Sequence, residues 1–233
     1  VSNSECNIDY SVGTCSIIFK EMPKYHISAC VSGNCKDGEK YNGDNYSFGE
    51  LSDGTYMTII SDGMGSGPQA DQESSATVEL IKKFTGSGFK KMTAINTINS
   101  IMGIKFNEDE KFSTLDLSSI DLYEGEINFI KMGAAASFIK RGDDIIVIRS
   151  KTLPIGILDK PDIDITDKRI INGDFIVMVS DGVLDCDSGS TGNFQWMVEF
   201  LRKLDCTDPK EMCQVIIDKA KEISGGKVKD DMT

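Results

Sequence analysis

Acidic side chains stand at three points of this sequence where they could bind a divalent cation. Two apolar runs, residues 57–60 and 175–179, each stop at the triplet Ser-Asp-Gly, which places Asp62 and Asp181 at the ends of two predicted strands. The acidic pair Asp230-Asp231 follows near the last residue. Carboxylates are preferred ligands of Mg²⁺ and Mn²⁺, and a neighbouring glycine lets its carbonyl approach a metal closely. Asp-Gly is also a common turn dipeptide, so only the three signals together favour a metal site.

Composition is compatible with such a site and excludes several other functions. The 233 residues are 39% hydrophobic and 27% charged, as in a globular domain with a substantial core. No apolar stretch approaches the ~20 residues that span a bilayer, and a signal-peptide pattern is absent from the sequence. The net charge of −12 argues against nucleic acids and anionic membranes as partners. We expect residues 1–233 to be one domain excised from a longer chain, whose remainder would carry any membrane anchor.

The seven cysteines show none of the spacings that would indicate a zinc or redox centre. Two of them, Cys30 and Cys35, leave a zinc site open as an alternative, but the single histidine, His26, cannot complete a mixed site with them. Free thiols in a reducing cytoplasm are the favoured interpretation, so we expect this domain to be cytoplasmic.

Hydrophobic periodicity predicts alternating groups of strands and helices. Glycine-containing turns separate the strands, and a capping box formed by Asp208 and Glu211, with Pro209 between them, starts the last helix. The predicted strands are 15–19, 25–31, 56–61, 114–123, 127–132, 137–140, 145–148, one beginning at 163 and one ending at 181; the predicted helices are 69–84, 90–102, 193–203 and one beginning after 208.

This order of elements predicts an α+β fold rather than a βαβ repeat. Hairpin signals between the central strands make the sheets antiparallel, and two such sheets should pack face to face with helices outside. On that frame Asp62 and Asp181 can lie at one edge of the sandwich. Asp230 would join them from a last strand, on which Asp231 points to the opposite face.

Seven short motifs, taken in order, resemble the bacterial branch of the PPM family of metal-dependent serine/threonine protein phosphatases, and most closely its sporulation phosphatases. The resemblance starts near Tyr25 and continues to the end of the sequence. The motifs are Asn42-Gly43-Asp44-Asn45-Tyr46-Ser47, Ser61-Asp62-Gly63-Met64-Gly65-Ser66-Gly67, Ser113-Thr114-Leu115-Asp116, Lys131-Met132-Gly133-Ala134-Ala135, Leu153-Pro154-Ile155-Gly156, Ser180-Asp181-Gly182 and Lys229-Asp230-Asp231-Met232-Thr233.

The resemblance implies a two-metal hydrolase with an α-β-β-α sandwich fold. By that resemblance Asp62 bridges two Mn²⁺ or Mg²⁺ ions and the Gly63 carbonyl binds one of them. Asp181 and Asp230 complete the shell of the other ion, and Asp44 acts through a coordinated water, so that Asp62 and Asp44 are the catalytic carboxylates. Asp231 matches a position that is often Asn, which suggests that Asp231→Asn is tolerated.

Two family features have no evident counterpart in this sequence. Eukaryotic relatives carry a histidine directly after the Asp-Gly step, a candidate general acid, where this chain has Met64. His26 falls on a predicted strand and is interpreted as structural. The phosphate-binding residue is unknown, because Lys36 and Lys40 are weak candidates that also fit solvated loop charges. Protonation of the leaving group would then come from water, or the chemistry would be slower.

The function implied by the resemblance is hydrolysis of phosphoserine or phosphothreonine on an anti-sigma factor antagonist, in the control of a sporulation sigma factor. The resemblance also implies that the two helices after Gly63 act as a switch and can form a homodimer. We therefore expect the isolated domain to bind its second metal poorly. Two alternatives stay open: a non-catalytic interaction module with this fold, and a phosphomonoesterase for small molecules. Retention of Asp44, Asp62, Asp181 and Asp230 favours an enzyme over a degenerate module.

Overall fold

The largest sheet is antiparallel and has five strands. The computed structural model describes residues 2–9, 14–106, 112–186 and 194–233. The strand order of the large sheet is β3-β4-β5-β6-β9, and every neighbouring pair is antiparallel. These strands are β3 Asp44–Glu50, β4 Thr55–Asp62, β5 Leu115–Asp121, β6 Glu126–Met132 and β9 Asp164–Arg169.

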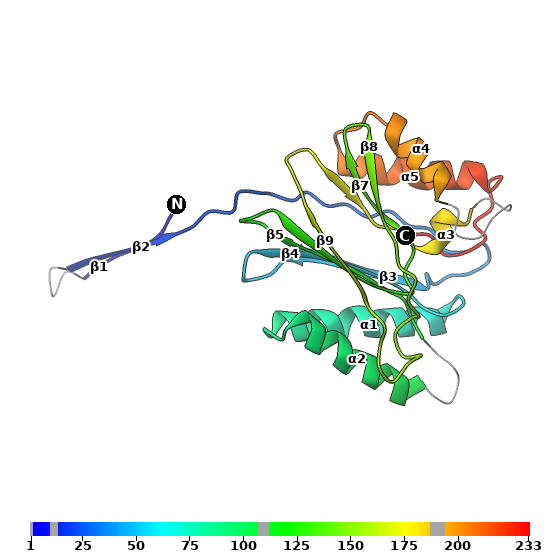
Figure 1. Ribbon diagram of the computed structural model, residues 1–233, viewed down its shortest axis with the longest axis horizontal. Helices are drawn as coiled ribbons and strands as arrows, with labels where there is room; N and C mark the ends of the chain where they lie inside the picture. The colour runs from blue at the N-terminus through cyan, green and yellow to red at the C-terminus, as the bar shows by residue number, and fades with distance from the viewer. Residues whose placement is uncertain (1, 10–13, 107–111, 187–193) are drawn as a thin grey trace.

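A second antiparallel sheet packs against the first, and helices cover the outside. The second sheet has the order β10-β7-β8. Figure 1 shows α1 and α2 on one side of the large sheet and α4 and α5 beyond the small sheet. The bounds are β7 Ser137–Arg141, β8 Asp144–Ile148, β10 Phe175–Val177, α1 Pro68–Gly86, α2 Lys91–Phe106, α3 Asp181–Leu184, α4 Gln195–Lys203 and α5 Pro209–Ile223.

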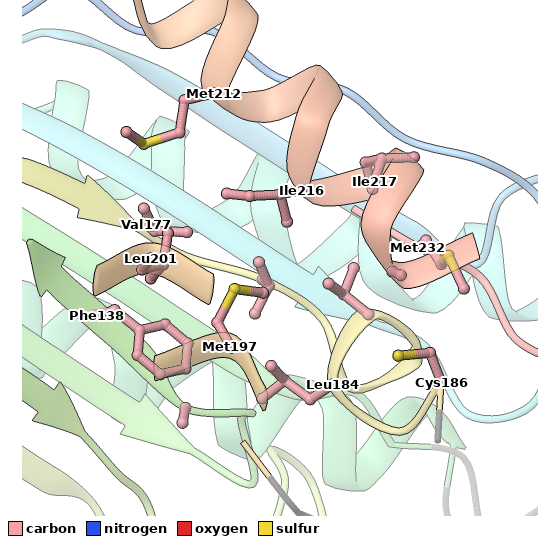
Figure 2. Packing of buried hydrophobic residues seen from close by; sticks show 14 of the residues in the cluster. Phe138, Val177, Leu184, Cys186, Met197, Leu201, Met212, Ile216, Ile217 and Met232 are labelled. Atoms are coloured by element: carbon pink, nitrogen blue, oxygen red, sulfur yellow. The ribbon is translucent and has the colours of Figure 1, made fainter. Parts of the chain in front are cut away.

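Three apolar clusters correspond to the three contacts between layers. One joins α1 and α2 to the large sheet, and a second, which includes Phe129 and Ile139, lies between the two sheets. The third joins the small sheet to α3, α4 and α5, and Figure 2 shows Phe138 and Met232 among its members. This layering confirms the predicted α+β sandwich of two antiparallel sheets flanked by helices.

The N-terminal region differs from the prediction. The hairpin of β1 (Ser2–Asp9) and β2 (Thr14–Lys20) projects away from the sandwich (Figure 1). The predicted strand 25–31 is wrong: this segment has no strand ladder. The backbone N–H groups of Lys24 and Tyr25 both donate to the Leu122 carbonyl, which fixes the start of the segment without pairing its length. Alternating apolar residues here reflect partial burial beside the sandwich rather than membership of a sheet.

Two predicted strand ends near the site are also shorter than expected. β10 stops at Val177, and the apolar run continues because Val179 is buried in the core and not because the ladder continues. The last strand predicted for Asp230 is reduced to one bridge between Met232 and Asn34. For the predicted helix 193–203, residue 193 lies outside the described residues, and the rest agrees with α4.

The last helix begins as the sequence predicts. The Asp208 side chain accepts a hydrogen bond from the Lys210 N–H at 3.0 Å, and Pro209 opens α5. Glu211 accepts from the Cys206 thiol at 3.5 Å, so its side chain is directed elsewhere than a capping box requires. No helix in the described part of the chain has both the length and the apolar content required to cross a bilayer.

Candidate metal centre

Asp44 and Asp62 face each other across the ends of two neighbouring strands. They are register partners in the β3–β4 pair. The Asp62 N–H donates to Thr114 Oγ1 at 2.9 Å, and the Thr114 N–H donates to the Asp62 carbonyl at 2.8 Å. The Gly63 N–H donates to the Gly43 carbonyl at 3.1 Å. Hydrogen bonds from both sides therefore hold the backbone of Asp62, and this fixes the position from which its side chain extends.

The C-terminal segment brings Asp230 to Asp181. Asp181 is the first residue of α3, and the preceding Ser180 N–H donates to the Thr233 carbonyl at 3.0 Å. Met232 and Asn34 exchange two backbone hydrogen bonds of 2.8 and 2.9 Å, and Met232 is buried in the third core cluster. These contacts fix the segment that carries Asp230. The sequence had predicted that a last strand would position this residue.

The glycines of both Ser-Asp-Gly triplets are explained by close backbone approach. A Cβ on Gly63 would lie 2.0 Å from the Ala70 carbonyl oxygen in α1, and a Cβ on Gly182 would lie 2.1 Å from the Asp231 carbonyl oxygen. Neither contact is compatible with a side chain. The sequence suggested glycine for access to a metal. The structure adds a separate packing reason for each glycine, and the role of the Gly63 carbonyl as a ligand stays a prediction.

Burial, with the charges of neighbouring carboxylates, raises the pKa of three aspartates at this edge. Burial raises the pKa of Asp62 to about 9, with Asp181, Asp44 and Asp230 adding to the effect in that order. Burial also raises the pKa of Asp181, followed by the charge of Asp230. These shared effects show that the four aspartates form one acidic cluster, although they come from four separate segments.

Asp44 is the most buried member of the cluster. Burial raises its pKa to about 7; the hydroxyls of Ser180 and Thr233 lie near enough to lower it in part, although neither reaches hydrogen-bond geometry. Within the described residues, neither Asp44 carboxylate oxygen has a hydrogen-bond partner. A buried carboxylate without a donor is costly unless something else satisfies it.

These residues fit a divalent cation. The donor set is oxygen-only, and a bound cation would stabilise the ionised carboxylates, which burial and the neighbouring negative charges disfavour. The described residues do not, however, include three His, Cys, Asp or Glu side chains already converged as in an assembled site. A cavity of about 150 Å³ adjoins Asp181 and Asp230 and is lined in part by Lys229 and Ser224.

Asp231 has a different environment from Asp230. It is 3% exposed, its Oδ1 accepts the Lys36 N–H and its Oδ2 accepts the Gly43 N–H, each at 2.8 Å. Asp231 therefore accepts hydrogen bonds, as its predicted role requires, and the role of Asp230 as a metal ligand stays a prediction. Because both Asp231 oxygens accept from N–H groups, an Asn amide would oppose one of these donors, which changes the expectation that Asn is tolerated there.

The remaining sequence candidates lie outside the acidic cluster. His26 follows Tyr25, which is bonded to Leu122 beyond one end of β5, whereas Asp62 contacts Thr114 beyond the other end. Met64, in the position of the eukaryotic histidine, is 48% exposed and its N–H donates to the Phe112 carbonyl. Lys40 is exposed. The backbone N–H of Lys36 donates to Asp231 Oδ1. A phosphate-binding residue stays unknown.

Helix α1 is bonded to the start of β3 and to the loop that follows β4. Ser74 Oγ donates to the Gly43 carbonyl at 2.5 Å, and Asn45 Nδ2 donates to Asp71 Oδ1 at 2.8 Å. Glu73 Oε2 accepts from the Met64 N–H at 3.3 Å. Sequence reasoning predicted that the position of α1 matters but not these contacts, because polar residues on an amphipathic helix are ordinarily assigned to solvent.

Comparisons with known proteins agree with this architecture. The profile of the family Stage II sporulation protein E (SpoIIE) matches residues 52–233. Stage II sporulation protein E of Priestia megaterium is 38% identical over the whole chain, which spans 40% of that relative's length. The solved PP2C phosphatase domain of Bacillus subtilis SpoIIE, with a fragment of its regulatory domain, has a TM-score of 0.87 at 35% identity, covering 94% of this chain and 65% of that one.

More distant structures share the fold alone. A bacterial serine phosphatase, solved as a variant with one substitution, has a TM-score of 0.71 at 16% identity, and the match covers 89% of this chain and 96% of that one. The family match and the order of the seven motifs lead to the same assignment. The chain belongs to the SpoIIE family and carries its PP2C-type phosphatase fold.

Proposed function

We propose that this chain is a divalent-metal-dependent phosphoprotein phosphatase that hydrolyses phosphoserine or phosphothreonine. The observation that carries the proposal is the gathering of Asp44, Asp62, Asp181 and Asp230 at one edge of the sandwich, where burial, with the charges of neighbouring carboxylates, raises the pKa of the first three. Such a cluster is unfavourable for the metal-free fold and favourable for binding two cations.

Each carboxylate has a distinct part in this proposal. Asp62 would contact both ions, with the Gly63 carbonyl on one of them, and Asp181 and Asp230 would complete the other shell. Asp44 would accept a hydrogen bond from a coordinated water through an oxygen that is otherwise without a partner. When bound, a pair of divalent cations supplies an acidified water as nucleophile and neutralises the phosphoryl oxygens. The chain's own contribution is to hold the carboxylates and exclude bulk water around Asp44.

Mn²⁺ and Mg²⁺ are the proposed cofactors. One solved structure of the Bacillus subtilis SpoIIE phosphatase domain was presoaked with Mn, and it is 31% identical to this chain with a TM-score of 0.51. The sole histidine of the sequence, His26, lies near the other end of β5, so we propose that water protonates the leaving group.

The proposed substrate is a phosphorylated anti-sigma factor antagonist, and the proposed assembly is a homodimer through α1 and α2. Membership of a sporulation family supports the first, and the bonds of α1 to Gly43 and Asn45, on either side of Asp44, support a regulatory role for that helix. Any membrane attachment would belong to regions outside this chain.

A turnover assay with two kinds of substrate tests the proposal. The purified chain should release phosphate from a phosphoserine protein with Mn²⁺, far less with EDTA, and not at all after Asp62→Asn. Efficient turnover of p-nitrophenyl phosphate alone would favour the small-molecule phosphomonoesterase. Absence of turnover on every substrate, with retained binding of a phosphoprotein, would favour the interaction module.

A further inference from the structure

A buried polar triad spans the two sheets beside the metal centre. Asp116 on β5 and Lys131 on β6 are register partners, and they are 2% and 1% exposed. Lys131 Nζ lies 2.5 Å from Asp116 Oδ2. Ser137 Oγ on β7 donates to the same Asp116 oxygen at 2.5 Å and accepts from Lys131 Nζ at 2.8 Å. The triad therefore fixes one oxygen of Asp116 from two directions.

Stability alone does not account for this arrangement. Burial lowers the pKa of Lys131, and the charge and hydrogen bond of Asp116 act in the opposite direction. A buried ion pair of this kind is often replaced by apolar residues with no loss of stability, or with a gain. Because such a pair contributes little net stability, we looked for another role for one of its atoms.

The other oxygen of Asp116 has no protein partner. Within the described residues, Asp116 Oδ1 is buried and receives no hydrogen bond. Asp116 also lines a small cavity of about 20 Å³, whose wall includes Asp62, Asp181 and Thr114. A polar cavity of about 10–15 Å³ or more can hold one water molecule with two or more polar partners. The size and the lining of this cavity meet both conditions.

We propose that one buried water in this cavity links Asp116 Oδ1 to the carboxylate of Asp62 or Asp181, making Asp116 a positioning residue of the metal centre. The water donates one hydrogen to Asp116 and the other to the cluster carboxylate. Lys131 already neutralises Asp116, so Asp116 adds no net charge that would call for a further cation. The inference rests on the proposed metal site and identifies what orients its carboxylates.

A double substitution separates positioning from simple structure. Asp116→Leu/Lys131→Met removes both charges and should keep the fold, with a melting temperature near that of the wild type. Mn²⁺ affinity, measured from the electron paramagnetic resonance of free Mn²⁺, should nevertheless fall about 10–100-fold, the usual effect of losing an outer-shell partner. Lys91→Met is the matched control, because Lys91 Nζ bonds Ser119 Oγ on the same β5 strand, away from the cavity.

Two results would overturn the inference. One is wild-type Mn²⁺ affinity in the folded double variant. The other is a high-resolution crystal structure of the wild type in which the cavity is empty, or holds a cation identified by anomalous scattering after a Mn²⁺ soak. Neither measurement requires turnover. A protein that holds the water and binds Mn²⁺ but hydrolyses no phosphoprotein would contradict the proposed function and leave this inference standing.

Discussion

Two cross-strand pairs of the same sheet carry buried aspartates in opposite electrostatic situations. In the β3–β4 register Asp44 faces Asp62, and in the β5–β6 register Asp116 faces Lys131. Like charges placed directly opposite destabilise a sheet, whereas opposite charges support it. Burial raises the pKa of both aspartates of the first pair, while the second pair includes its own counter-ion.

The difference shows where this fold depends on something from outside. The Asp116–Lys131 pair is neutral as built, so the chain can bury it without a ligand. The pair at the strand ends is joined by Asp181 and Asp230, and the repulsion among these groups is satisfied only by protons or by cations. Function is expected at the pair that local rules of sheet design disfavour.

The largest expected effect comes from removing one charge of the disfavoured pair. Asp62→Asn keeps the shape of the side chain but removes the carboxylate proposed to contact both ions. We expect Mn²⁺-stimulated phosphate release to fall by about 10³-fold or more, since a two-ion site holds and activates the attacking water. In EDTA the same variant should melt at a higher temperature than the wild type. Retained Mn²⁺-stimulated turnover in folded Asp62→Asn would refute the bridging role.

The pH dependence of the metal-free protein provides a control for that interpretation. The pKa values of Asp44 and Asp62 are raised from 3.8 to about 7 and about 9 on folding, so the folded state binds more protons than the unfolded state between these limits. The contribution of the cluster to stability therefore falls as pH rises from about 4 to 9. Thermal melts in EDTA should show this decline, and saturating Mn²⁺ should reduce it. A cluster contribution that rose over this range would contradict the raised pKa values.

The next effect distinguishes the two aspartates of the C-terminal segment. Asp230→Ala should reduce Mn²⁺ affinity and most of the activity with little change in melting temperature. Asp231→Asn should leave a folded fraction that still binds Mn²⁺, but it should lower the free energy of unfolding by about 1–3 kcal/mol, because one backbone N–H loses its acceptor. Denaturation and Mn²⁺ titration of both variants give the comparison. Loss of Mn²⁺ binding in Asp231→Asn together with retention in Asp230→Ala would reverse the assignment.

A smaller effect is expected at the contact that joins α1 to the pair. Ser74 Oγ donates to the Gly43 carbonyl, directly before Asp44. Ser74→Ala should weaken Mn²⁺ affinity by about 2–30-fold, corresponding to about 0.5–2 kcal/mol of coupling through a contact that touches no ligand. Ser100→Ala is the control, because Ser100 bonds only within α2 at an exposed position. Equal Mn²⁺ affinity in both variants would count against regulation through α1, as would tight binding of two ions by the isolated wild-type chain.

Local patterns predicted the elements around the site well. The first Ser-Asp-Gly triplet located Asp62 at the end of β4, as an apolar run followed by Asp-Gly predicts. The second triplet located Asp181, but there β10 stops at Val177 and Asp181 begins α3. The hairpin signals likewise predicted the antiparallel sheets. Asp116–Lys131 was missed, although counting the β5–β6 hairpin outward from its turn places these opposite charges face to face. The signal was present, but it depends on register rather than on local composition.

Other features could not be predicted because they depend on partners distant in sequence. Residues 25–31 alternate as a strand does, yet no neighbouring strand in the described part of the chain pairs with them, so the pattern records burial without a ladder. The same holds for Val179, which is buried beyond the end of β10. The two acceptor bonds of Asp231 join residues nearly the whole chain apart, and periodicity carries no information about such contacts.

The smallest expected effect concerns His26. A histidine that served as general acid would have to reach the acidic pair, but Tyr25 is bonded at Leu122, beyond the end of β5 remote from Thr114 and Asp62. His26→Gln should therefore change kcat and its pH profile less than about twofold, because proton transfer would pass through water at the metal centre. The measurement is the pH–rate profile between about pH 5.5 and pH 8.5 at saturating Mn²⁺, where an unperturbed histidine titrates at about 6.5. If a folded His26→Gln variant lost an ionisation from this profile, His26 would belong to the site, and the description of the acidic pair without a histidine would be wrong.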